Sequence, residues 1–171
     1  MNQFLLVDGY NVINAWPHLK EVGKVNLEEA RDALVQELVD YKHYTGYSVI
    51  VVFDAHYVKG SDVKRFFTKG VEVVFTKEHQ TADSYIEKKV EELMKDRKNS
   101  VMVATSDWAE QQVVLGSGAI RISARELKIE LDKIIKKIHK KAAASKQIRS
   151  TIEDRIGKDI VEKLEKWRRN Q

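Results

Sequence analysis

The chain has 171 residues, of which 43% are hydrophobic and 33% charged, the balance of a globular protein with one core of ordinary size. Apolar runs fall far short of the roughly 18 residues that cross a bilayer, and the N-terminal segment lacks the basic region of a secretory signal. We therefore expect a cytoplasmic protein with no membrane partner. Because the chain has no cysteine, disulfides, thiolate metal sites and cysteine nucleophiles are excluded.

The charge is unevenly distributed along the chain. The net charge is +4, but residues 133–171 carry +8 and residues 1–132 carry −4. A basic C-terminal segment on an acidic body suits a polyanionic partner, since neutralised phosphates release counterions. A solvated helical face explains the same pattern equally well.

Short apolar runs rich in β-branched residues alternate with segments of helical periodicity, which predicts an α/β fold with a parallel sheet. The predicted strands are 4–7, 48–53, 71–75, 100–104 and 119–122. The predicted helices are 27–44, 82–98, 107–115 and 124–141. Three of these helices begin at capping-box patterns, Asn26 with Glu29, Asp107 with Glu110, and Ser123 with Glu126. Residues 55–70, which join two strands, are predicted to form a basic loop.

A second helical stretch is predicted after the alanines at 142–144. Its apolar residues recur every four positions and form one stripe, which packs on the domain or docks on a partner. They are Ile148, Ile152, Ile156, Ile160 and Leu164. We therefore predict one domain over 1–141 and a basic helical extension over 142–171.

Acidic residues follow the predicted strands. Asp8, Asp54 and Asp107 each end an apolar strand, and Asp83 begins the helix after the third strand. Because the carboxyl ends of parallel strands share one edge of a sheet, these carboxylates are expected to face a common crevice. Gathered carboxylates repel each other unless a cation relieves them, and Mg²⁺ or Mn²⁺ prefers such oxygen ligands. The pattern predicts a metal site suited to phosphodiester hydrolysis.

Each candidate has a structural alternative. Helix capping explains Asp83 and Asp107, and a turn explains Asp54. Asn11, in the string Asp-Gly-Tyr-Asn, is expected to support Asp8 by hydrogen bonding. Two further pairs are expected near the same edge. His56 and His79 are phosphate contacts, proton donors or exposed loop residues. Trp16 and Trp108 are base-stacking or core residues.

Several classes of site are excluded by missing motifs. No GxGxxG follows the first strand and no GxxxxGK[ST] occurs, so no nucleotide cofactor is expected. The second aspartate of aspartyl-phosphate phosphatases and a serine nucleophile elbow are also absent.

Four short motifs in order carry a resemblance to a known family. They are Leu6-Val-Asp8-Gly-Tyr-Asn11-Val-Ile13, Val52-Phe-Asp54, Thr81-Ala-Asp83 and Ala104-Thr-Ser-Asp107. Across about residues 1–140 the chain resembles the NYN domains, relatives of PIN-like nucleases, and most closely their bacterial YacP-like branch. The resemblance implies a PIN-like, Rossmann-like three-layer fold with strand order 3-2-1-4-5 and a Mg²⁺- or Mn²⁺-dependent site. It also implies cleavage of mRNA in association with the ribosome.

The same resemblance assigns roles to individual residues. It implies that Asp8 is the central metal ligand, that Asp83 and Asp107 are the other catalytic acids, and that Asn11 and Asp54 support them. We expect in-line attack of a metal-activated water on the phosphodiester. The loop cations would guide the RNA backbone, and they are Lys59, Lys64, Arg65 and Lys69. The alternatives are a non-catalytic module that binds RNA or the ribosome, a DNA-directed nuclease, and a small-molecule phosphatase.

Overall fold

The computed structural model describes residues 2–54, 63–106 and 118–169. The strands are β1 (Asn2–Asp8), β2 (Ser48–Phe53), β3 (Lys64–Thr68), β4 (Val71–Phe75), β5 (Asn99–Ala104) and β6 (Ile120–Ile122). The helices of the described part are α1 (Gly9–Ala15), α2 (Pro17–Val25), α3 (Leu27–Thr45), α4 (Ala82–Met94) and α6 (Ala124–Arg169).

The strands form one mostly parallel sheet with the order β3-β4-β2-β1-β5-β6. Every neighbouring pair is parallel except β3 and β4. The five predicted strands correspond to β1, β2, β4, β5 and β6, and their implied order 3-2-1-4-5 is confirmed. The strand β1 is therefore central, and its carboxyl end lies between those of β2 and β5.

The prediction of a loop throughout 55–70 is wrong for residues 64–68, which form β3 antiparallel to β4. Lys69 and Gly70 connect the two strands, with φ of 47° and 87°. Two successive residues with positive φ are typical of the tight turn that joins a hairpin. The usual sequence signal is Asn-Gly or Asp-Gly, and Lys-Gly here gave none. Residues 55–62 lie outside the described part of the chain.

The helices also depart from the prediction. The short helices α1 and α2 were not predicted, although Pro17 at the first position of α2 is a favoured start. The helix predicted over 82–98 ends at Met94, and the one predicted over 107–115 lies outside the described residues. The two helices predicted after Ser123 form one continuous helix, α6, because alanine is a strong helix former and Ala142–Ala144 do not interrupt it.

Local capping fixes where the predicted helices begin. Asn26 Oδ1 accepts from the N–H groups of Glu28 and Glu29 at the start of α3. At the start of α6, Ser123 N–H donates to Glu126 Oε2 at 2.8 Å and Glu126 N–H donates to Ser123 Oγ at 3.2 Å. These reciprocal bonds form the predicted capping box. The Ser123 hydroxyl, which donates to Glu126 Oε2 at 2.7 Å, and the Ser123 N–H lower the pKa of Glu126.

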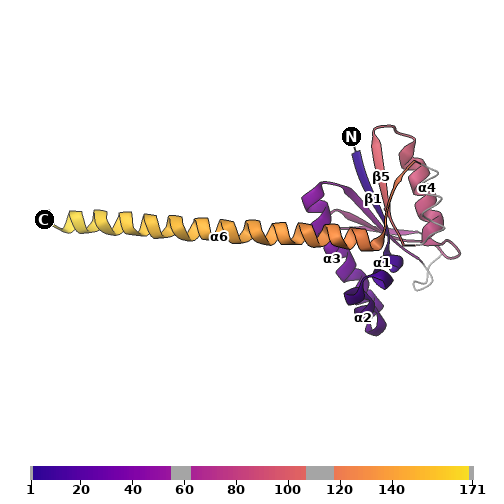
Figure 1. Cartoon of the computed structure of the whole chain (residues 1–171), viewed down its shortest axis with the longest axis horizontal. Helices are drawn as coiled ribbons and strands as arrows, with labels where there is room; N and C mark the ends of the chain where they lie inside the picture. Colours follow the sequence, from indigo (N-terminus) through magenta and orange to yellow (C-terminus); the bar gives the residue numbers. More distant parts are fainter. Residues whose placement is uncertain (1, 55–62, 107–117, 170–171) are drawn as a thin grey trace. The chain divides into compact units, whose positions relative to one another are not determined.

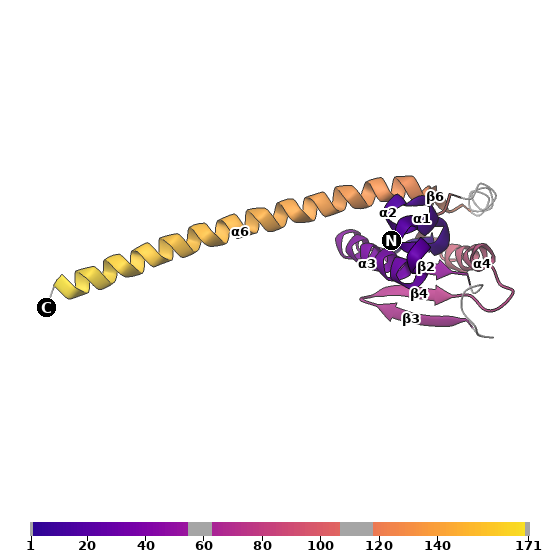
Figure 2. The ribbon, with the colours of Figure 1, turned by 90° about the horizontal axis from the view of Figure 1, so that it is seen from below.

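The sheet lies between two helical layers, with α3 and α4 on opposite sides (Figures 1 and 2). The α4 face of the sheet is covered by Ala82, Tyr85, Ile86 and Val90, which pack on Leu6, Ile50, Val52, Val74, Val101 and Val103. These sheet residues pair with one another across neighbouring strands, as Leu6 does with Ile50 and Val103 and Val52 does with Val74, so their side chains share one face. The alternation of side chains along a strand thus places Asp8 on the same face as Leu6.

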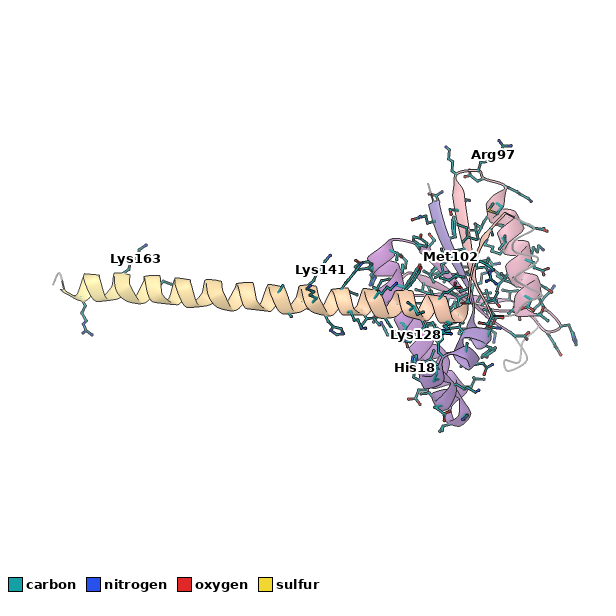
Figure 3. The ribbon with its side chains drawn as sticks, in the orientation of Figure 1. His18, Arg97, Met102, Lys128, Lys141 and Lys163 are labelled. Atoms are coloured by element: carbon teal, nitrogen blue, oxygen red, sulfur yellow. The ribbon has the colours of Figure 1, made fainter. Side chains whose placement is uncertain are left out.

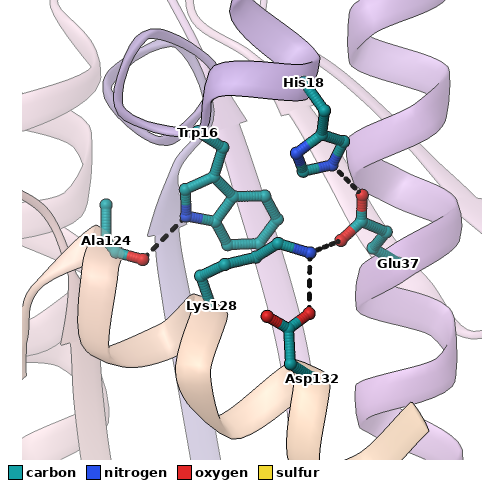
Figure 4. Close-up of polar contacts among 6 residues, drawn as sticks. All are labelled: Trp16, His18, Glu37, Ala124, Lys128 and Asp132. Atoms are coloured by element: carbon teal, nitrogen blue, oxygen red, sulfur yellow. Dashed lines mark hydrogen bonds and ion pairs between the residues drawn. The ribbon is translucent and has the colours of Figure 1, made fainter.

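Trp16 is a core residue rather than a base-stacking one. It is only 1% exposed, and its Nε1 donates to the carbonyl of Ala124 at 2.7 Å. Lys128 Nζ lies 5.2 Å from the Trp16 ring centroid and pairs with Glu37 at 3.2 Å and Asp132 at 3.0 Å. His18 contacts the other oxygen of Glu37 (Figure 4). This cluster ties α2, α3 and the first turns of α6 together.

The chain divides into two compact units, Met1–Asp132 and Lys133–Gln171. The functional division predicted between residues 141 and 142 stays a prediction. Within the described residues, no helix combines the length and apolarity of a membrane span.

Candidate active site

Asp8 occupies the carboxyl end of the central strand. Its side chain is on the α4 face, the residue is 8% exposed, and its partner in the register is Val52 of β2. One carboxylate oxygen accepts a hydrogen bond from Asn11 N–H at 3.1 Å, so Asp8 is also the N-cap of α1. Capping stabilises a carboxylate at a helix start, and it gives a largely buried acid a fixed orientation.

Gly9 allows α1 to begin directly after Asp8. A Cβ on Gly9 would lie 2.2 Å from Cε1 of Phe53, the last residue of β2. Only glycine therefore lets the first turn of α1 approach the end of β2 this closely. The Tyr10 ring also contacts Phe53, with ring centroids 5.2 Å apart.

Asn11 connects Asp8 to the neighbouring strand end. Its Oδ1 accepts from Ser106 N–H at 2.8 Å, two residues beyond β5. The Ser106 hydroxyl in turn accepts from Ala124 N–H at 3.3 Å, at the start of α6. A single side chain thus holds the ends of β1 and β5 together at this edge.

Asp54 and Asp83 belong to the same edge of the sheet. Asp54 directly follows β2 and is half-buried, and Thr76 N–H donates to the carbonyl of Phe53 beside it. Asp83 is half-buried in the first turn of α4, where Thr81 is the N-cap. Asp83 and Asp8 both lie on the α4 side of the sheet.

The predicted acidic set lies only partly within the described residues. Asp107 lies outside the described residues, directly after Ser106. In the ranges 2–54, 63–106 and 118–169, no three Asp, Glu or His side chains gather closely enough to hold a metal ion. The structure therefore shows Asp8 as a helix cap, and its role as a metal ligand stays a prediction.

The predicted basic residues separate on the two faces and edges of the sheet. Arg65 pairs with Val74 and so lies on the Asp8 face, whereas Lys64 pairs with Phe75 and lies on the opposite face. Lys69 is at the other edge, where the parallel strands begin, and its Nζ donates to Gln36 Oε1 at 3.1 Å. The expectation that all these cations follow the acidic edge is not met by Lys69. Lys59 lies outside the described residues.

Of the predicted edge residues His56, His79 and Trp108, the structure describes only His79. Its side chain is 91% exposed, in a loop position with φ of 65°. His56 and Trp108 lie outside the described part. Conversely, the structure adds cations that the sequence analysis did not single out. Lys77, Lys88 and Lys89 line a cavity together with Arg65.

The architecture and the acidic strand ends define the class of the protein. The family model of the YacP-like NYN domain matches residues 5–169, so this chain belongs to that family. NYN domains are PIN-like nucleases, and the match extends over the C-terminal helical segment as well as the sheet domain.

Named relatives come from Bacillus subtilis. The curated protein described as uncharacterized protein YacP of strain 168 is 45% identical over 165 residues, covering 96% of each chain. A crystal structure of Rae1 (YacP) from this organism has a TM-score of 0.75 at 44% identity, covering 97% of this chain and 94% of that one. A point mutant of Rae1 has a TM-score of 0.69 at 47% identity, covering 80% and 79%.

Proposed function

We propose that this protein is a metal-dependent endoribonuclease that cleaves mRNA in association with the ribosome. Membership in a nuclease family supports the reaction class. The observation that carries the proposal is Asp8, a carboxylate 8% exposed at the carboxyl end of the central strand. This end of a parallel sheet is where α/β folds bind ligands, and a carboxylate there is a hard oxygen ligand for a divalent cation.

The donor chemistry fits Mg²⁺ or Mn²⁺. Asp8 and Asp83 supply hard oxygen ligands on one side of the sheet, and Asp107 follows Ser106 at the adjacent strand end. When bound, such an ion supplies a Lewis acid that stabilises the negative charge developing on a phosphodiester. We assign Asp8, Asp83 and Asp107 as the residues that would hold it, with Asp54 in support.

The neighbouring side chains orient the acid and the substrate. Asn11 N–H fixes the Asp8 carboxylate, and Asn11 Oδ1 is engaged by Ser106. The Asn11 amide nitrogen then remains as a donor for a phosphate oxygen. Arg65, on the Asp8 face, would contact the RNA backbone, with Lys59 and Lys64 as further contacts. The basic residues of 133–171 would bind the ribosome or RNA electrostatically.

Asp8→Asn tests this proposal because asparagine also caps helices and should leave the fold intact. We expect cleavage of an mRNA on programmed ribosomes to fall at least about 100-fold, with an unchanged thermal unfolding midpoint. Wild-type cleavage should require Mg²⁺ or Mn²⁺ and stop in EDTA. The matched control is Asp32→Asn, which makes the same change at an exposed carboxylate of α3.

Three outcomes distinguish the alternatives. Full cleavage by folded Asp8→Asn would overturn the site. Binding of RNA or ribosomes by wild type without any cleavage would favour the non-catalytic module. Equal cleavage of matched single-stranded RNA and DNA would favour a nuclease without preference for RNA.

A further inference from the structure

A cavity of about 200 Å³ lies between the edge hairpin, the loop after β4 and helix α4. Seven of its lining residues are polar or charged and come from three separate segments. They are Arg65, Lys77, Gln80, Tyr85, Lys88, Lys89 and Glu92. None of the assigned acids lines it.

The cavity shares a sheet face with Asp8. Register partners connect Arg65 to Val74, Val74 to Val52, and Val52 to Asp8, in one row across four strands. Paired residues point to the same face, so both side chains are on the α4 side. With strands spaced by about 4.8 Å, the row spans about 14 Å from Arg65 to Asp8. A short run of single-stranded RNA bridges such a distance.

The cavity lining is strongly cationic. Lys89 pairs with Glu92, the carboxylate of the lining, at 3.1 Å. The ion pairs among the described residues leave Arg65, Lys77 and Lys88 without a carboxylate partner. Three such cations around one cavity attract an anion of comparable size, and a phosphate group is the anion that recurs along RNA.

Two residues that line the cavity each have a buried polar atom that lacks a hydrogen-bond partner within the described structure. These atoms are the Tyr85 hydroxyl and Gln80 Oε1. Tyr85 is 7% exposed, and its ring lies 5.7 Å from the Arg65 guanidinium carbon. Burying a hydroxyl without a hydrogen-bond partner is unfavourable, so a ligand that accepts its proton gains affinity.

We propose that this cavity binds one ribonucleotide unit of the RNA substrate, next to the cleavage site. Arg65, Lys77 and Lys88 hold its phosphate, and the Tyr85 hydroxyl donates to a phosphate oxygen. Gln80 Oε1 accepts from the ribose 2′-hydroxyl, the group that distinguishes RNA from DNA. The inference rests on the proposed RNA substrate, but it concerns binding and is independent of the metal.

The sharpest test is Tyr85→Phe, which removes one oxygen and keeps the ring beneath Arg65. Binding of a fluorescently labelled single-stranded RNA of about 10 nucleotides is measured by anisotropy in EDTA, where cleavage does not interfere. We expect binding to weaken about 5-fold, while the unfolding midpoint stays the same or rises, because an unsatisfied hydroxyl is gone. Tyr47→Phe, at the opposite edge before β2, is the matched control. Unchanged RNA binding by Tyr85→Phe would overturn the proposal.

Charge is tested with two matched triple variants. Arg65→Ala/Lys77→Ala/Lys88→Ala removes the cavity cations, and Lys95→Ala/Arg97→Ala/Lys98→Ala removes the same charges beyond α4. Arg97, one of these three control residues, lies at the edge of the sheet where β5 begins (Figure 3). We expect the first variant alone to lower the slope of log affinity against log salt by about 0.7, since it loses one phosphate contact and each such contact in single strands contributes about 0.7. Equal slopes in both variants would show that only net charge matters.

Gln80→Leu tests recognition of the sugar. We expect it to weaken RNA binding about 5-fold and leave a DNA strand of the same sequence unaffected. An equal loss for RNA and DNA would remove the assigned role of Gln80. If the cavity variants bind RNA normally while Asp8→Asn still abolishes cleavage, only the proposed nucleotide site is refuted. If the cavity variants bind RNA more weakly but the wild-type protein never cleaves it, only the proposed nuclease activity is refuted.

Discussion

Asn11 Oδ1 accepts a hydrogen bond from Ser106 N–H at 2.8 Å, although the residues are 95 positions apart. This contact joins the first turn of α1 to the chain leaving β5. Asn11 N–H meanwhile donates to Asp8. One residue therefore sets the orientation of one candidate acid and the path of the backbone that leads into Asp107.

Asn11→Ala should remove this connection. We expect the free energy of unfolding to fall by about 1 kcal/mol, because Ser106 N–H loses its partner, and cleavage to fall more than stability predicts. Chemical denaturation and the ribosome cleavage assay measure the two effects. Asn2→Ala is the control, since Asn2 donates to Asn99 at 3.1 Å at an exposed position on the opposite edge. Wild-type cleavage by Asn11→Ala would contradict the positioning role.

Gly9→Ala should destabilise the domain through its contact with Phe53. The added methyl group lies 2.2 Å from the ring, and we expect a cost of about 1–3 kcal/mol. Phe53→Leu should restore part of this loss in the double variant by making room. Gly23→Ala is the control, because its Cβ has ordinary 3.5 Å contacts and should stabilise helix α2 by about 0.5–1 kcal/mol. Additive effects of Gly9→Ala and Phe53→Leu would argue against a direct clash.

Lys128→Met should expose the contribution of the cluster around Trp16. The ammonium interacts with Glu37 and Asp132 at side-chain exposures of 27%, 20% and 50%. Because this site is partly screened by water, we expect a loss of about 1 kcal/mol in the free energy of unfolding at low ionic strength, which shrinks in high salt. Lys24→Met, which removes the exposed pair with Glu21, should cost less. A loss that persists in high salt would indicate packing of the side-chain stem instead.

Tyr41 should make the protein sensitive to alkali. Burial, together with the nearby Glu130 carboxylate, raises the pKa of its phenol well above the usual range. A raised folded-state pKa gives stability that is complete below the unfolded pKa of about 10 and declines as the pH rises above it. We expect Tyr41→Phe to reduce that decline by up to about 1.4 kcal/mol per pH unit. Denaturant titrations from pH 8 to strongly alkaline conditions measure it, and an unchanged slope would assign the sensitivity to other groups.

The sequence predicted features whose cause is local. Strand β1 ending at Asp8 and the capping box of Ser123 and Glu126 both follow from a few adjacent residues. The alternation of strand and helix patterns predicted a parallel sheet, whereas the order of its five strands came from the resemblance to the NYN domains. Placement of Lys64 and Arg65 on opposite faces was out of reach, because it depends on where the hairpin turn sets the register. The cavity around Tyr85 depends on three segments that meet only in the folded chain.

Among the described residues, β3 is an edge strand of the sheet. Two of its aromatic residues are exposed, Phe66 by 47% and Phe67 by 71%. Such a strand has backbone groups on its outer side that a second molecule can pair with, and charged side chains are a common protection against that pairing. Lys64 and Arg65 supply the protection here by electrostatic repulsion between copies. Neutralising both residues should therefore favour association of molecules strand to strand, and limiting that association would be a second role of the same two cations.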